Sequence, residues 1–347
     1  MGQQDRDERL LVSPIPEFDA SAGLGRFRER VGRDRVAPSR GWIDALMARM
    51  SLARGAWARP LAAAAAIVLV ASLAAVTGLA DTVLTVFEPK QVATIQVDPR
   101  QLRGVPDPTE YGTLTWIAQP SLRPVADAST ATAAAGFEPL VPASLPAGVP
   151  SQARFAVMGE SKATFQFDEA KARAAAARVN ATLPPMPPAI ATTTLTMTGG
   201  PAIMQQYGSG TGGWTAVASG PLPAAPQLSG TQTGPLVVIV QARAPVVTSN
   251  GATVEELRDY LLAQPGIPPA LAAQLRAIGD PVRTLLFPLP LEVAEGRTVT
   301  VRGTQGVFFA DSTGLGSGVV WVKDGFVHAV LSTMTESELL ALVNALR

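Results

Sequence analysis

The chain has 347 residues, enough for one large domain or two ordinary ones, and its 28 Lys+Arg balance 28 Asp+Glu. It has no cysteine and a single histidine, which excludes disulfides, thiolate metal sites, cysteine nucleophiles and a multi-histidine metal site within one chain. Residues 1–59 carry eleven arginines against eight acidic residues, whereas residues 81–347 are slightly acidic. Neither part has the basic excess of a nucleic-acid binder, so we expect no direct contact with nucleic acid.

The N-terminal segment, residues 1–59, is expected to be partly disordered with two short amphipathic helices. Residues 1–16 are charged and interrupted by prolines, without periodicity. Residues 18–35 and 42–50 each place apolar side chains on one helical face. Two interpretations stay open: the second helix lies on the inner membrane surface, or both helices bind a cytosolic partner protein. The candidate partner-binding residues are Leu24, Phe27, Val31, Trp42, Ile43 and Leu46.

An uncharged segment follows at residues 60–80, between Arg59 and Asp81. As a helix it would be roughly 31 Å long, against a hydrocarbon thickness of about 30 Å. A buried soluble helix would have a polar face, which this segment lacks. A cleaved signal peptide would not follow 59 residues of chain. We therefore predict a transmembrane anchor, with insertion favoured by Leu61, Ile67, Val68, Leu69, Val70, Leu73, Val76 and Leu79.

The flanking charges predict the orientation of this anchor. Four arginines precede it closely, whereas the twenty residues after it carry one lysine and one arginine. By the positive-inside rule, the N-terminus should be cytoplasmic and residues 81–347 should lie outside the plasma membrane.

The remainder is expected to be a linker (81–135) followed by an extracytoplasmic domain (136–347) of α+β class, an antiparallel sheet with helices on one face. Two helices begin with capping boxes, at Thr253 and Thr335. The predicted helices are 168–180, 253–262, 268–278 and 335–346. The predicted strands are 152–158, 163–167, 193–198, 236–242, 298–302, 307–310, 319–323 and 326–332.

The sharpest local signal is VVWVKDGFVHAVLS, residues 319–332. Asp324-Gly325 between alternating apolar runs predicts a two-residue hairpin turn of the primed type. That turn places Trp321 opposite His328. We expect one face of this hairpin to be core: Val320, Val322, Val327, Ala329 and Leu331.

Motifs for catalysis are missing from the sequence, and we expect neither an enzyme nor a cofactor. His328 is predicted beside an indole on a strand, which is a packing position and not one member of a catalytic triad. GSGTGGW (208–214) lacks the Lys-Ser/Thr of a phosphate-binding loop. Five aromatic residues are assigned to the core, with a hydrophobic ligand pocket as the alternative: Trp214, Phe308, Phe309, Trp321 and Phe326.

Four stretches resemble an uncharacterised family of extracytoplasmic domains attached to membrane-tethered anti-sigma-factor-like proteins of bacteria: GFEPLVPASLPAG (136–148), FQFDEAKARAAAA (165–177), LRDYLLAQPGIPPALAAQLRAIGD (257–280) and GLGSGVVWVKDGFVHAVLSTMTESELLALVNAL (314–346). The resemblance implies a single-pass regulator with an exterior sensing domain and a cytosolic segment that binds a sigma factor. Many such proteins carry a His-x₃-Cys-x₂-Cys zinc motif in the cytosolic helices, and residues 1–59 contain neither histidine nor cysteine.

The leading hypothesis is therefore a membrane regulator whose N-terminal segment binds a cytosolic protein such as a sigma factor, and whose exterior domain binds an unknown ligand or senses the envelope. The alternative is a membrane-anchored binding or structural module without a cytosolic partner.

Overall fold

The computed structural model describes residues 83–97, 108–178, 180–210, 214–216, 226–228, 232–290, 294–311 and 316–347. All of them belong to one compact unit, Arg40–Arg347. The helices are η3 (Pro108–Glu110), α4 (Ala128–Ala135), α5 (Glu169–Arg178), α6 (Pro188–Ala191), α7 (Val254–Leu262), α8 (Pro269–Arg276) and α9 (Glu336–Asn344). The strands are β1 (Leu84–Phe87), β2 (Gln91–Val97), β3 (Gly112–Ala118), β4 (Leu122–Val125), β5 (Ala153–Met158), β6 (Ser161–Phe167), β7 (Thr194–Gly199), β8 (Ala202–Gly210), β9 (Trp214–Ala216), β10 (Pro226–Leu228), β11 (Gln232–Arg243), β12 (Val246–Ser249), β13 (Thr284–Pro290), β14 (Ala294–Val301), β15 (Thr304–Asp311), β16 (Ser317–Lys323) and β17 (Phe326–Ser332).

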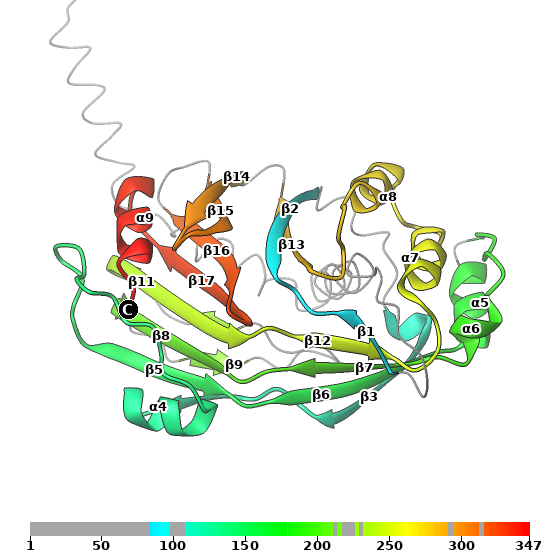
Figure 1. The fold of residues 1–347 in the computed structure, drawn as a ribbon, viewed down its shortest axis with the longest axis horizontal. Helices are drawn as coiled ribbons and strands as arrows, with labels where there is room; N and C mark the ends of the chain where they lie inside the picture. The colour runs from blue at the N-terminus through cyan, green and yellow to red at the C-terminus, as the bar shows by residue number, and fades with distance from the viewer. Residues whose placement is uncertain are drawn as a thin grey trace, which may run out of the picture. The chain divides into compact units, whose positions relative to one another are not determined.

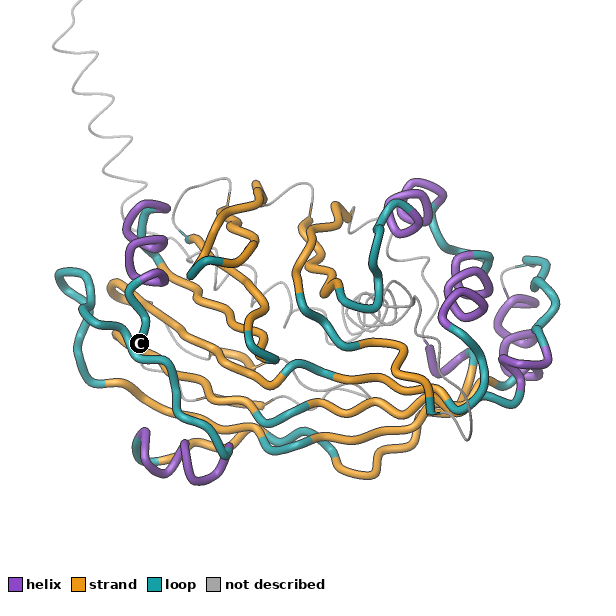
Figure 2. Tube along the Cα trace, viewed as in Figure 1, coloured by secondary structure: helices purple, strands orange, loops and turns teal. Residues whose placement is uncertain are grey.

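The chain has the expected α+β class, with mainly antiparallel sheets and a few helices (Figures 1 and 2). All eight predicted strands and all four predicted helices are present, with ends that differ by a few residues. Both capping boxes form: the Glu256 carboxylate accepts from Thr253 N at 2.8 Å, and the Glu338 carboxylate accepts from Thr335 N at 3.0 Å. These hydrogen bonds satisfy N–H groups that a helix start leaves without partners.

The predicted linker 81–135 is wrong for the described part of that segment. It contains β1, β2, β3, β4 and α4, and each of these strands pairs with a strand from beyond residue 135. Helix α4 begins at Asp127, whose carboxylate accepts from Thr130 N at 2.8 Å, and it ends at Gly136 with φ 75°. The alanine- and threonine-rich composition concealed a short helix whose alanines pack closely against a sheet.

Four strands of the eight-stranded sheet continue end to end into four strands of the five-stranded sheet, and we call each such pair a strand line: β11–β12, β8–β7, β5–β6 and β4–β3. All four lines are broken at the same position along the sheets. The five-stranded sheet has the order β1-β12-β7-β6-β3 and the eight-stranded sheet has the order β14-β15-β16-β17-β11-β8-β5-β4. Register is kept across the interruption, since Thr198 faces Val246 and Ala202 faces Ala242. Prolines, which lack the N–H that a ladder needs, and glycines occupy the breaks: Pro120, Gly159, Gly200, Pro201 and Pro245. Figure 1 shows these lines extending from one sheet into the other.

One face of the eight-stranded sheet is covered by helices α4 and α9. Alanines of α4 pack on Phe155, Val157 and Ile203, while Leu339 and Leu342 of α9 pack in the cluster around Trp321. Between the helices, the segment that follows Gly136 is held by buried amides. Gln205 Nε2 donates to Leu140 O at 2.8 Å, and Leu140 N donates to Gln241 Oε1 at 2.9 Å. The first stretch that carries the family resemblance thus covers a sheet face.

The opposite face of the eight-stranded sheet is covered by the parallel pair β2 and β13. Val92, Leu285 and Leu289 pack against that sheet, whereas Ile95 and Leu286 pack against α7 and α8. The run TLLFPLP of β13 is nearly all apolar, as burial in both directions requires, whereas β2 buries Val92, Ile95 and Val97 and exposes Gln91, Thr94 and Gln96.

The five-stranded sheet buries one face and exposes the other. Phe165 and Leu195 pack with Ile190 and with Val254 and Leu257 of α7 on the buried face. The other face bears a row of threonines in register across all five strands: Thr85, Thr248, Thr196, Thr164 and Thr115. Such β-branched polar side chains suit a half-exposed pleated surface, so this row is explained by sheet stability.

The predicted hairpin is confirmed in turn and register. Asp324 and Gly325 have φ 52° and 78°, as a type I′ turn requires, and Trp321 faces His328. The predicted core face is wrong in part: Val327, Ala329 and Leu331 of β17 are half-buried, whereas His328, Val330 and Ser332 of the opposite face are buried. Both faces of this sheet are covered, and α9 covers the Trp321 face more completely. Of the five aromatic residues, Phe308, Phe309 and Trp321 are buried and Phe326 is half-buried, while the side chain of Trp214 lies outside the described residues.

Candidate functional site at the junction after the apolar segment

All fourteen site residues that the sequence predicts lie outside the described residues. They are the partner-binding set Leu24, Phe27, Val31, Trp42, Ile43 and Leu46, and the anchor set Leu61, Ile67, Val68, Leu69, Val70, Leu73, Val76 and Leu79. Within the described ranges, no helix is long and apolar enough to cross a membrane.

The site that the structure offers instead is the junction, residues 83–97, through which the chain enters the folded domain. β1 pairs with β12 at the edge of the five-stranded sheet, and after three residues β2 pairs with β13. Val86, Phe87, Val92 and Ile95 are each at most 3 % exposed. The chain that follows the apolar segment is therefore part of three core clusters within a few residues.

Backbone hydrogen bonds tie the turn between β1 and β2 to the start of β13. Glu88 N donates to Val282 O at 3.0 Å, and the N–H groups of Lys90 and Gln91 both donate to Arg283 O, at 2.7 and 2.9 Å. This doubly accepting carbonyl sets the parallel register, in which Gln91 faces Thr284. The two segments are almost two hundred residues apart in the chain, so the junction joins the beginning of the folded domain to its C-terminal part.

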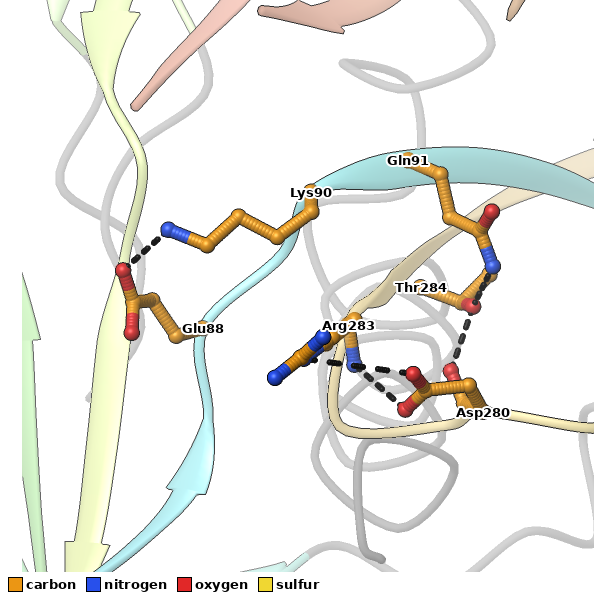
Figure 3. Close-up of polar contacts among 6 residues, drawn as sticks. All are labelled: Glu88, Lys90, Gln91, Asp280, Arg283 and Thr284. Carbon is orange, nitrogen blue, oxygen red and sulfur yellow. Dashed lines mark hydrogen bonds and ion pairs between the residues drawn. The ribbon is translucent and has the colours of Figure 1, made fainter. Parts of the chain in front are cut away.

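Six side chains surround this contact, drawn in Figure 3: Glu88, Lys90, Gln91, Asp280, Arg283 and Thr284. The Thr284 hydroxyl is buried, accepts from Gln91 Nε2 at 2.8 Å and donates to the carbonyl of Asp280. Asp280 also accepts from the backbone N–H of Arg283 at 3.2 Å. The uncharged part of this cluster is thus a continuous chain of hydrogen bonds from β2 to the loop before β13.

The charged part of the cluster is exposed. Lys90 pairs with Glu88, and Arg283 lies 4.0 Å from Asp280, but each of these side chains is 45–61 % exposed. Ion pairs in water contribute about 0–1 kcal/mol each, so the buried apolar strands and not the charges hold the junction. The cluster is a set of hydrogen bonds and exposed ion pairs that joins β2 to the start of β13.

A second cluster surrounds the single histidine. The rings of His328 and Trp321 stack at 4.8 Å with an interplanar angle of 11°, and Arg243 lies over the rings of Phe137 and Phe326. Burial, with a smaller effect of the Arg302 charge, lowers the pKa of His328 to about 4. The imidazole is therefore neutral at pH 7, and its contact with the indole is a packing contact, as the sequence predicts.

Two further observations bear on chemistry. Burial raises the pKa of Tyr260 to about 12, and its ring packs edge-on against Phe167 in the core of the five-stranded sheet. Among the described residues, no three His, Cys, Asp or Glu side chains gather closely enough to hold a metal ion.

Sequence reasoning missed the junction because it assigned residues 81–135 to a linker. The signal was present in QVATIQV, where β-branched residues alternate with polar ones. Its partner TLLFPLP contains two prolines, which usually argue against a central strand, and this concealed the pairing. Comparison of the chain with protein-family models, with curated proteins and with solved structures gives no match.

Proposed function

We propose that the chain is a single-pass membrane regulator of the anti-sigma-factor type. In this proposal residues 60–80 cross the plasma membrane with the N-terminus in the cytoplasm. The exterior α+β domain senses the envelope or a ligand, and the N-terminal segment binds a cytosolic protein such as a sigma factor. The observation that carries the proposal is an uncharged segment of membrane-spanning length that ends four positions before Leu84, the first residue of a strand within the folded domain.

The junction supports a regulator because it leaves little slack between anchor and domain. A flexible linker would let the exterior domain change without effect on the anchor. Here β1 and β2 belong to the core. A change in how β13 packs against the eight-stranded sheet would therefore displace β2 and β1, and with them the residues that follow the anchor.

The alternative is an anchored binding or structural module without a cytosolic partner. Residues 1–59 favour it in one respect, because they lack the histidine and cysteines of the zinc motif common in the family that the chain resembles. In that case the N-terminal segment would only hold the membrane surface through its arginines and Trp42.

Affinity purification separates the two functions. The full chain, tagged at its C-terminus and solubilised in mild detergent, is isolated from bacterial cells together with bound cytosolic proteins. A regulator retains a sigma factor, and Phe27→Asp, on the apolar face of the first predicted helix, reduces that retention at least tenfold. The matched control is Ile117→Asp in the exterior domain, where Ile117 is 62 % exposed. If no cytosolic protein is retained, the regulator proposal falls and the anchored module remains.

A further inference from the structure

The junction also fixes which end of the exterior domain lies nearest the membrane. The apolar segment ends at Ala80, and Leu84 already pairs with Ser249 in the five-stranded sheet. A chain spans at most about 3.6 Å per residue, so Leu84 lies within about 14 Å of the end of the anchor in any conformation of the residues between. The part of the domain around Leu84 must therefore be close to the lipid headgroups.

Pairing and packing identify that part of the domain. Ser249 faces Leu195, so the turn after β12 and the chain before β7 lie at the level of Leu84. These two segments are joined directly, since Thr194 N donates to Asn250 Oδ1 at 2.7 Å and Asn250 N donates to Thr194 O at 3.3 Å. The side chains of Leu84, Met186 and Ala189 pack against the same core cluster. The segment 181–193, which includes α6, is therefore at the anchored end.

One part of the surface at this end has the chemistry that a lipid headgroup region accepts, while α5 and the first turn of α7, at the same end, are charged. Residues 179–242 contain no Asp, Glu, Lys, Arg or His, and segment 181–193 is the part of that stretch beside Leu84. Its exposed residues are prolines, alanines and threonines: Thr182, Pro185, Pro188, Ala191 and Thr192. An uncharged surface enters the interface without the desolvation cost of an ionised side chain.

The other end of the domain lies far from Leu84. Helix α9 begins beside Thr333, whose N–H donates to Leu236 O, and Leu236 faces Gly208. Gly208 is thirteen residues along the strand line from Leu195, which corresponds to roughly 40 Å of strand. Figure 1 shows α6 and α9 at opposite ends of these strand lines.

We propose that the outer leaflet of the membrane is the partner of this end of the domain, and that segment 181–193 together with Asn250 and Gly251 lies against its headgroups. The inference rests on the proposed anchor at 60–80 and adds the face by which the domain meets the lipid. The α9 end points away from the membrane and is the end available to an exterior ligand or protein.

The chain has no cysteine, so single cysteines can be labelled without background. Ala191→Cys and Thr182→Cys report on the proposed contact, Ser337→Cys on the far end, and Ser72→Cys on the anchor itself. Each full-length variant carries a fluorophore and is reconstituted into phosphatidylcholine vesicles that contain either headgroup-labelled acceptor lipid or acyl-chain spin label. Circular dichroism confirms that each variant folds as the parent chain does.

The proposal predicts energy transfer to headgroup acceptors at least threefold stronger from positions 191 and 182 than from position 337. Equal transfer from both ends, or stronger transfer from position 337, would overturn it. Position 72 keeps the two proposals distinguishable. If spin-labelled acyl chains do not quench a label there, the anchor fails. Quenching at position 72 without the difference between the two ends overturns only the membrane-facing surface.

Discussion

The hairpin β16–β17 and the parallel pair β2–β13 are both central to the exterior domain, but different interactions define them. The hairpin is set by a two-residue turn, and its register follows from Asp324 and Gly325. The parallel pair joins segments almost two hundred residues apart, and its register is set by the Arg283 carbonyl and by burial on both faces. Local backbone geometry specifies the first, whereas the surrounding core specifies the second.

The largest effect is expected when a buried side chain of the parallel pair is shortened. Ile95 is 2 % exposed between β13 and the helices, so Ile95→Ala should lower the free energy of unfolding by about 2–5 kcal/mol. The control Ile117→Ala removes the same atoms from a 62 % exposed side chain and should cost less than about 0.5 kcal/mol. Urea unfolding of the detergent-solubilised chain, followed by tryptophan fluorescence, measures both. Equal losses would show that β2 is not part of the core.

The hairpin is tested next through its histidine. The folded-state pKa of His328, about 4, lies below the ordinary value near 6.5, so the unfolded chain binds the proton more readily. Stability should be fully present above pH 6.5 and should fall by about 3 kcal/mol as the pH drops from 6.5 to 4. His328→Phe, which keeps an aromatic ring against Trp321, should remove that share of the pH dependence. Urea midpoints at pH 7.5 and 4.5 measure it, and an unchanged difference between the two pH values in the variant would contradict the assignment.

The turn itself gives a smaller effect with a close control. A methyl group added at Gly325 or at Gly159 meets no atom within 4 Å, but only Gly325 has a positive φ, of 78°. Gly325→Ala should therefore destabilise the domain by about 1–2 kcal/mol through backbone strain alone. Gly159→Ala should be neutral or stabilising by up to about 1 kcal/mol. Thermal unfolding of the two variants side by side would reveal the difference, and similar shifts would show that the turn does not set the register.

The smallest effect is expected from the charges of the junction. Glu88→Gln and Asp280→Asn each remove one exposed ion pair and should lower stability by about 0–1 kcal/mol, less at high salt. Urea unfolding at low and high ionic strength measures this. A loss of several kcal/mol from either variant would mean that the exposed charges, and not Val92 and Ile95, hold β2 in place.

The same difference explains what could be predicted from sequence. The turn, the capping boxes at Thr253 and Thr335 and the alternating strands depend on residues within a few positions, so the sequence predicts them, and for the hairpin it predicts the register as well. The face of β17 that is more deeply buried depends on where α9 packs, and it was predicted incorrectly.

The candidate site could be predicted less well. No residue near Gln91 or Thr284 in the sequence indicates that the two segments pair, and two prolines in β13 argue against a strand. The core cluster that Leu84, Met186 and Ala189 share likewise forms only when the sheet assembles. The predicted residues of the N-terminal segment and of the anchor lie outside the described residues, and they remain predictions.

The most direct test of the account is the two-sided placement of the chain. In an otherwise cysteine-free chain, Gln3→Cys and Glu160→Cys each provide one thiol, and Glu160 is exposed in the exterior domain. A membrane-impermeant maleimide applied to intact cells, with the outer envelope opened where one is present, should label position 160 at once and position 3 only after the plasma membrane is permeabilised. Equal labelling of both positions before permeabilisation, or recovery of the chain in the soluble fraction, would contradict the anchor at 60–80.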